Sequence, residues 1–86
     1  MSNFKLFHFT ADWCQPCKKM KPIIEDYIRY NPEIMYEQID VDNDIETAKH
    51  YGILSIPSFI VIDDNANVIS RHTGIATKEE LNKLFK

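Results

Sequence analysis

The stretch Ala11–Pro22, with the sequence ADWCQPCKKMKP, contains both cysteines of the 86-residue chain, separated by two residues. A nearly continuous apolar run, FKLFHFT at residues 4–10, comes directly before it, as expected of a strand that is covered on both faces. Apolar residues at helical spacing follow the stretch. The pair is therefore predicted to lie where a strand passes into a helix. Three interpretations are open: a redox couple, half of a metal site, or two buried thiols.

Chain length and composition indicate a single globular domain over residues 1–86. Hydrophobic residues make up 44% of the chain, and the lysines are scattered over a chain of net charge −3, so no nucleic-acid partner is expected. The longest uninterrupted apolar run, Phe59–Ile62, is too short to cross a bilayer, and the N-terminus lacks the features of a secretory signal. We therefore expect a cytoplasmic monomer with no membrane partner.

Hydrophobic patterns predict four strands, at residues 4–10, 34–40, 58–62 and 68–72. A helix between the first two strands implies a right-handed parallel crossover, and the turn residues at 63–67 predict an antiparallel hairpin. The predicted order is β-α-β-α-β-β-α. The fold class is therefore α/β, with a four-stranded mixed sheet flanked by helices on both faces.

Capping signals predict where the two shorter helices begin. Asn43 with Glu46 resembles a capping box, and Ile45 is expected to face the core from the helix that follows. Thr77 with Glu80 forms a second capping box ahead of the last helix.

Cys14 is predicted to occupy the N-cap of the first helix, which begins near Gln15. The free N–H groups of the opening turn and the positive end of the helix dipole then lower the pKa of its thiol, because both stabilise a thiolate. Pro16 lacks an N–H, which is harmless this early in a helix, and the N–H of Cys17 stays available to the Cys14 sulfur. Cys17 lies one turn further in, is expected to be less exposed, and is close enough for a disulfide.

This asymmetry predicts a role for each cysteine in thiol–disulfide exchange. Cys14 attacks a substrate disulfide to form a mixed disulfide, and Cys17 then attacks Cys14 and releases the reduced product. Two cysteines that merely pack in the core are the plain alternative. A metal site needs about four ligands, whereas the chain offers two thiols and three scattered histidines. A metal site within one chain is therefore not expected, and a metal cluster shared between subunits is the remaining alternative. No metal or other cofactor is expected.

With the motif Trp13–Lys18 (WCQPCK) in place, the chain resembles the thioredoxin family from about Leu6 to Phe85. Several separated features occur in the family's order, and together they are far more specific than a lone C-x-x-C. They are Trp13, Pro22, the segments IDVD at 39–42, YGI at 51–53 and IPS at 56–58, and Gly74. The extra N-terminal strand and helix of most members are missing. Neither the C-P-Y-C motif nor the paired glycines of glutaredoxins are present, so thioredoxin is the better match.

The resemblance implies a cis peptide bond between Ile56 and Pro57, which turns the backbone so that an extended peptide can pair with Ile56 as an added strand. It also implies a flat, mostly apolar docking surface around the Cys14 sulfur. This surface comprises Trp13, Ile56, Pro57, Thr73, Gly74 and Ile75. A plain half-buried tryptophan and an ordinary proline at a strand start are the alternatives for Trp13 and Pro57.

The chain departs from the family at three positions near the cysteines. His8 occupies the position of a buried acid, and Gln38 that of an accompanying lysine, which together avoid two buried charges. We hypothesise that His8 acts as a base toward Cys17, because imidazole accepts a proton near neutral pH. A neutral histidine that only fills the core is the alternative. Gln15 replaces a glycine between the cysteines and is expected to change potential and partner choice.

The sequence therefore predicts a thiol–disulfide oxidoreductase with a reversible Cys14–Cys17 disulfide. Pro16 and the missing export signal favour the reducing direction. An electron donor resembling thioredoxin reductase or glutaredoxin is implied, with disulfide-containing proteins such as ribonucleotide reductase or peroxidases as substrates. Two alternatives remain: a glutathione-dependent, glutaredoxin-like reductase, and a non-catalytic adaptor that uses the docking surface to hold a partner.

Overall fold

Four strands form one mixed sheet in the computed structural model, which describes residues 4–85. The order across the sheet is β2-β1-β3-β4. At the centre, β1 (Lys5–Thr10) pairs in parallel with β2 (Met35–Asp40) and antiparallel with β3 (Ser58–Ile62), and β3 forms a hairpin with β4 (Val68–Thr73). The predicted element order and mixed sheet are confirmed. Residues 1–3 and 86 of the predicted domain lie outside the described residues.

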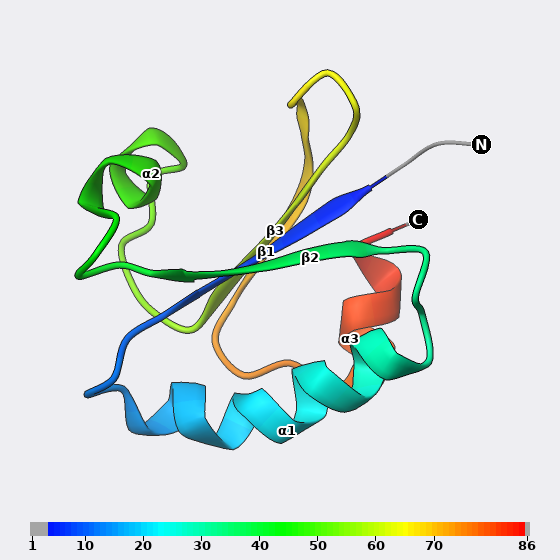
Figure 1. The fold of residues 1–86 in the computed structure, drawn as a ribbon, viewed down its shortest axis with the longest axis horizontal. Helices are drawn as coiled ribbons and strands as arrows, with labels where there is room; N and C mark the ends of the chain where they lie inside the picture. The colour runs from blue at the N-terminus through cyan, green and yellow to red at the C-terminus, as the bar shows by residue number, and fades with distance from the viewer. Residues whose placement is uncertain (1–3, 86) are drawn as a thin grey trace.

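Three helices cover the two faces of this sheet (Figure 1). The long helix α1 (Gln15–Arg29) and the short helix α3 (Lys78–Lys83) lie on one face, and α2 (Ile45–His50) lies on the other. Each face has its own apolar core, so the sheet is a layer between two cores, as predicted.

The central strands are buried on both faces because their side chains alternate between the two cores. Leu6 of β1 and Phe59 of β3 lie in the core beneath α1 and α3. Phe7, Phe9 and Ile60 lie in the core beneath α2. This alternation follows the two-residue period of a strand and explains why β1 and β3 read as continuous apolar runs.

The start of α2 differs from the prediction by one residue. Asp44 is the N-cap: its carboxylate accepts hydrogen bonds from the backbone N–H of Thr47 (3.2 Å) and from the Thr47 hydroxyl (2.7 Å). The capping box predicted to start at Asn43 is therefore wrong. The carbonyl of Asp40 accepts hydrogen bonds from the N–H groups of both Asn43 and Asp44. Asn43 therefore belongs to the turn between β2 and α2, and the helix starts one residue later than predicted. As a result Ile45 opens the helix with 54% of its surface exposed, instead of facing the core.

The capping box of α3 is confirmed. The Thr77 hydroxyl accepts from the N–H of Glu80, and the Glu80 carboxylate accepts from the N–H of Thr77, both at 3.1 Å. Hydrogen bonds from Thr77 lower the pKa of the Glu80 carboxyl. Leu81 and Leu84 then reach the core beneath α1.

The shifted cap of α2 is tested by a matched pair of alanine substitutions. Asp44→Ala is expected to lower the free energy of unfolding by about 1 kcal/mol, because two hydrogen bonds at the helix start are lost. Asn43→Ala is expected to change it by less than about 0.5 kcal/mol. Urea unfolding monitored by circular dichroism measures both values. An equal or larger effect at Asn43 would contradict the assigned cap.

Candidate functional site

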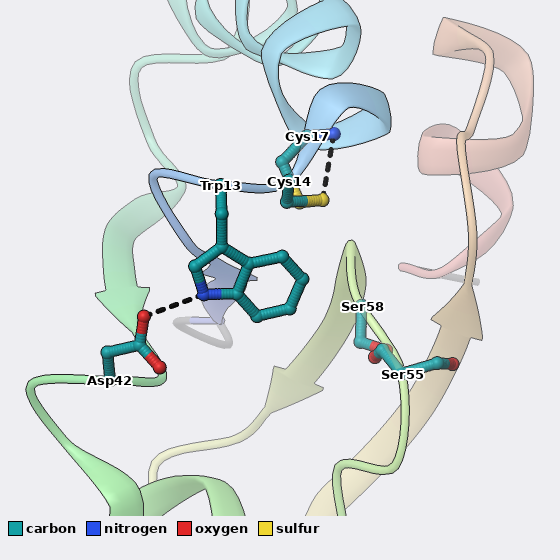
Figure 2. The surroundings of a disulfide bond; sticks show 6 residues. All are labelled: Trp13, Cys14, Cys17, Asp42, Ser55 and Ser58. Carbon is teal, nitrogen blue, oxygen red and sulfur yellow. Dashed lines mark hydrogen bonds between the residues drawn. A yellow bond between two sulfur atoms is a disulfide. The ribbon is translucent and has the colours of Figure 1, made fainter.

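The cysteine pair lies at the start of α1, just beyond the carboxyl end of the central strand β1. Cys14 is the N-cap residue, with extended backbone angles (φ −88°, ψ 106°), and its N–H donates to the carbonyl of Ala11 at 3.1 Å. The Sγ atom of Cys14 accepts a hydrogen bond from the backbone N–H of Cys17 at 3.2 Å (Figure 2). The sulfur thus occupies the position of a capping acceptor, as predicted.

The two cysteines form a disulfide bond, with the sulfur atoms 2.19 Å apart and the Cα atoms 5.2 Å apart. This Cα separation lies within the usual range for disulfides. Two thiols that only pack in the core are therefore excluded. Among residues 4–85, no group of three or more His, Cys, Asp and Glu side chains is arranged to hold a metal ion.

Both cysteines are buried in this disulfide form. The exposed fraction is 3% for Cys14 and 2% for Cys17, so the expected difference in exposure is almost absent. They form a small apolar cluster with Ala11, against which Val41 and Ile56 pack. What distinguishes the two sulfurs is the hydrogen bond from the helix start, which within residues 4–85 is accepted by Cys14 and not by Cys17.

Trp13 lies beside the disulfide with 66% of its surface exposed, so it is not an ordinary half-buried aromatic. Its indole Nε1–H donates to a carboxylate oxygen of Asp42 at 2.8 Å (Figure 2). The sheet explains this contact: β1 and β2 are parallel, Thr10 lies opposite Asp40, and their carboxyl ends are therefore adjacent. The sequence reading missed Asp42 as the partner of Trp13, although it belongs to the 39–42 motif.

Two further segments of the predicted docking surface meet through the β3–β4 hairpin. The Ile56–Pro57 peptide bond is cis. The Pro57 carbonyl accepts a hydrogen bond from the N–H of Gly74 at 2.8 Å, and Thr73 lies opposite Ser58 in the sheet. Figure 2 shows Ser55 and Ser58 on the segment that leads into β3, where the Ser58 hydroxyl donates to the Ser55 carbonyl at 2.6 Å.

The members of the predicted surface differ in how much they can contribute to a contact. Thr73 is exposed, as is Ile75, with an exposed fraction of 46%, whereas Ile56 and Gly74 are half-buried. The Pro57 side chain is fully buried. The ring of Pro57 therefore supports the surface from below and offers it little contact area.

An apolar hollow of about 380 Å³ lies next to Trp13. Leu54 borders it and is 98% exposed, which is unusual for a large apolar side chain. The sequence reading missed Leu54, although it lies two residues before Ile56. The hollow is lined by Trp13, Val41, Ala48, Ile53, Leu54, Ser55 and Ile56.

His8 of β1 is buried inside the protein, with an exposed fraction of 1%. Its ring stacks on Phe59 with centroids 4.7 Å apart, and its Nδ1 lies 3.0 Å from the Tyr36 hydroxyl oxygen. Its Nε2 is buried with no hydrogen-bond partner among the described residues. Burial lowers the pKa of His8 to about 4, so the side chain is neutral at pH 7. The sequence reading missed Tyr36. The expectation that Gln38 avoids a second buried charge is wrong, because Gln38 lies exposed on the edge strand.

Comparison with known proteins agrees with this geometry. The family model described as Thioredoxin matches residues 2–86. The thioredoxin of Bacillus subtilis is 38% identical over 80 residues, which are 92% of this chain and 76% of that protein. The thioredoxin of Chlamydia trachomatis is 34% identical over 84 residues, which are 98% of this chain and 81% of that protein.

The chain belongs to the thioredoxin family. A solved thioredoxin structure from Fasciola hepatica superimposes with a TM-score of 0.88 at 26% identity, covering 96% of this chain and 79% of that one. Thioredoxins are disulfide oxidoreductases, and the bonded C-x-x-C pair gives this family member the same redox centre. Within residues 4–85, no helix has the length and apolar character needed to cross a bilayer.

The buried, neutral state of His8 makes a prediction about stability. A histidine in the unfolded chain has a pKa of ~6.5, whereas the pKa of His8 in the folded protein is about 4. Between these two pH values the unfolded state binds one proton more than the folded state does. The free energy of unfolding should therefore fall as the pH is lowered through this window, with His8 contributing up to about 1.4 kcal/mol per pH unit.

Paired variants isolate this contribution. In His8→Leu the curve of unfolding free energy against pH should be flatter over this window, because leucine does not titrate. The control His50→Leu removes an exposed histidine and should keep the slope of the original protein. Urea unfolding at a series of pH values measures the three curves. Parallel curves for His8→Leu and the original protein would show that His8 does not carry the predicted penalty.

Proposed function

We propose that this thioredoxin-family protein reduces protein disulfides, with Cys14 as the nucleophile and Cys17 as the resolving thiol. The observation that carries the assignment is the hydrogen bond from the N–H of Cys17 to the Cys14 sulfur at the start of α1. A thiolate accepts such a bond better than a thiol does, so this environment lowers the pKa of Cys14 in the reduced protein. Cys17 has no comparable donor from the helix start, and it acts second.

The exchange proceeds in two steps that balance atoms and electrons. The Cys14 thiolate attacks one sulfur of the substrate disulfide, forms a mixed disulfide and releases the other substrate sulfur as a thiolate. Cys17 loses its proton and attacks Cys14, which forms the Cys14–Cys17 disulfide and releases the second substrate thiolate. Two electrons have then passed from the dithiol to the substrate, and a reductase returns them to the protein. The form with the Cys14–Cys17 disulfide is the oxidised end point of this cycle.

The substrate is proposed to be an extended peptide that carries a disulfide. Its contact surface comprises Trp13, Ile56, Thr73, Gly74 and Ile75, with Pro57 supporting it from below. The apolar hollow bordered by Trp13 and Leu54 favours a peptide with an apolar side chain near its cysteine. Pairing of the peptide backbone with Ile56 would fix the direction of the chain across the Cys14 sulfur.

Pro16 between the cysteines supports the reducing direction. Thioredoxin itself has a potential of about −270 mV, against about −120 mV for the exported oxidant of the same family. We propose the cytoplasm as the site of action, since the chain is homologous to bacterial thioredoxins, which are typically cytoplasmic. The electron donor is expected to be a thioredoxin reductase or a glutaredoxin-like protein. Ribonucleotide reductase and peroxidases are candidate substrates.

Serine substitutions separate the two cysteine roles. Cys14→Ser should abolish insulin reduction in the presence of NADPH and a thioredoxin reductase, because no nucleophile is left. Cys17→Ser should still attack but fail to resolve, so a mixed disulfide on Cys14 should accumulate and be detected by mass spectrometry. Accumulation on Cys17 in the Cys14→Ser variant would reverse the assignment.

Two controls distinguish the other functions. Turnover of a glutathione mixed disulfide that exceeds insulin reduction would indicate a glutaredoxin-like enzyme instead. Full biological activity in the double serine variant would indicate an adaptor whose sulfurs are not needed.

His8 is proposed to accept the proton of Cys17 during resolution. In the reaction of the reduced protein with Ellman's reagent, the first thionitrobenzoate reports attack by Cys14 and the second reports resolution by Cys17. His8→Ala should slow the second release by about tenfold or more between about pH 6 and 9, since general base catalysis contributes about 10²–10⁴-fold. The first release should not change, and His50→Ala should slow neither. An unchanged second release in His8→Ala would remove His8 from the mechanism.

A further inference from the structure

We propose that Tyr36 is a positioning residue for His8. The Tyr36 hydroxyl takes the proton from Nδ1 of the imidazole while Nε2 takes the proton of Cys17. The pair would then conduct the proton of the resolving thiol from the buried interior to water. This proposal deepens the proposed function and rests on the role given there to His8.

The geometry holds the imidazole between two strands. Tyr36 lies on the edge strand β2 and is half-buried, and its hydroxyl oxygen is 3.0 Å from Nδ1 of His8. On the other side, Phe59 of β3 stacks on the imidazole at an interplanar angle of 14°. In the sheet register His8 lies opposite Gln38 on β2, so Tyr36 reaches it diagonally, across two residues. The ring orientation is therefore fixed by one hydrogen bond and one stacking contact.

The second ring nitrogen is left without a partner. Nε2 of His8 is buried and makes no hydrogen bond to any of the described residues. Buried polar atoms normally have partners, so such an exception requires an explanation. His8 lies on the face of β1 that carries Leu6 into the core beneath α1, and Cys17 is one of the buried residues of α1, in its first turn. A transient bond with the reduced Cys17 thiol would satisfy this nitrogen.

A lone imidazole is a poor base at this position. Burial lowers the pKa of His8 to about 4, so a free-standing imidazolium in the interior is unfavourable. Burial, together with the negative charge of Glu25 on α1, raises the pKa of Tyr36 to about 12, so its hydroxyl stays neutral. Phe59 adds no charge from β3, and the hydroxyl of Tyr27 on α1 points away, to Asn82 of α3. If the imidazole of His8 and the hydroxyl of Tyr36 each release one proton as they receive another, both stay neutral and no charge is buried.

The step balances as a relay of three protons. The S–H bond of Cys17 breaks and its proton goes to Nε2. The N–H bond at Nδ1 breaks and its proton goes to the Tyr36 oxygen. The original Tyr36 proton goes to water. The products are a Cys17 thiolate, which attacks the Cys14 sulfur, together with a neutral histidine whose proton has changed nitrogen and a neutral tyrosine.

The relay predicts that the tautomer of His8 depends on the redox state. In the disulfide form the proton lies on Nε2 and the Tyr36 hydroxyl donates to Nδ1. In the dithiol form the proton lies on Nδ1, which donates to the Tyr36 oxygen, and Nε2 faces the thiol. The ¹⁵N chemical shifts of the two ring nitrogens distinguish these tautomers, and a purely structural role of the hydrogen bond would not exchange them.

Tyr36→Phe is the decisive variant because it keeps the ring and removes only the hydroxyl. In the reaction with Ellman's reagent it should slow the second thionitrobenzoate release by about tenfold below the pKa of Cys17 and leave the first release unchanged. Above that pKa the thiolate forms without a base, so the rates of variant and original protein should converge. Tyr27→Phe, which also removes a hydroxyl that is hydrogen-bonded inside the fold, is the matched control and should slow neither step.

Three results would overturn the proposal: an unchanged second release in Tyr36→Phe, an equal slowing at every pH, or a His8 tautomer that is the same in both redox states. If His8→Ala slows resolution and Tyr36→Phe does not, the role of Tyr36 fails while the proposed function stands. If the original protein reduces no disulfide with its reductase, the proposed function fails as well.

Discussion

The hydrogen bond from the N–H of Cys17 to the sulfur of Cys14 links the fold of this protein to its chemistry. It forms because the central strand β1 ends at Thr10 and a tight turn, closed by the N–H of Cys14 and the carbonyl of Ala11, delivers Cys14 to the cap of α1. The N–H groups in the first turn of a helix have no hydrogen-bond partners inside the helix, and a sulfur placed there accepts a hydrogen bond from one of them. The contact that begins the helix is thus also the one that favours a thiolate.

The sheet determines what else surrounds that sulfur. β1 lies between a parallel and an antiparallel neighbour, so the carboxyl end of β2 and the start of β3 both reach the edge of the sheet where α1 begins. Asp42 thereby holds the indole of Trp13, and Pro57 is tied to Gly74 beyond β4. Reactive groups of open α/β sheets lie at such an edge because loops from several strands converge there. Val41 and Ile56, which lie just beyond β2 and just before β3, pack against the cysteines at this edge.

Behind the cysteines the interior is polar but uncharged. An ionised side chain in this position would need a partner or would lose much of its hydration energy. His8 instead shares a hydrogen bond with Tyr36 and stacks on Phe59, and both titratable groups are shifted toward their neutral forms. An uncharged pair of this kind can exchange protons without a buried ion, which suits the resolving role proposed for Cys17.

Much of the fold could be predicted from the sequence because local rules act on neighbouring residues. The run at 4–10, the capping box at Thr77 and the cysteines at a helix start are signals of this kind, and the structure confirms each of them. The cap of α2 was misplaced by one residue because the length of the preceding turn depends on hydrogen bonds to the Asp40 carbonyl.

The partners of the site residues depended on tertiary structure alone. The hydrogen bond between Trp13 and Asp42 and the contact of His8 with Tyr36 each join residues that are distant in the chain. The exposure of Leu54 likewise depends on which residues pack around it. Strand order and register decide such contacts, and a pattern of residue types along the chain does not encode which diagonal neighbour a side chain reaches. The sequence by itself determined where the reactive pair lies and what it does, and the packing of the sheet decided which groups surround it.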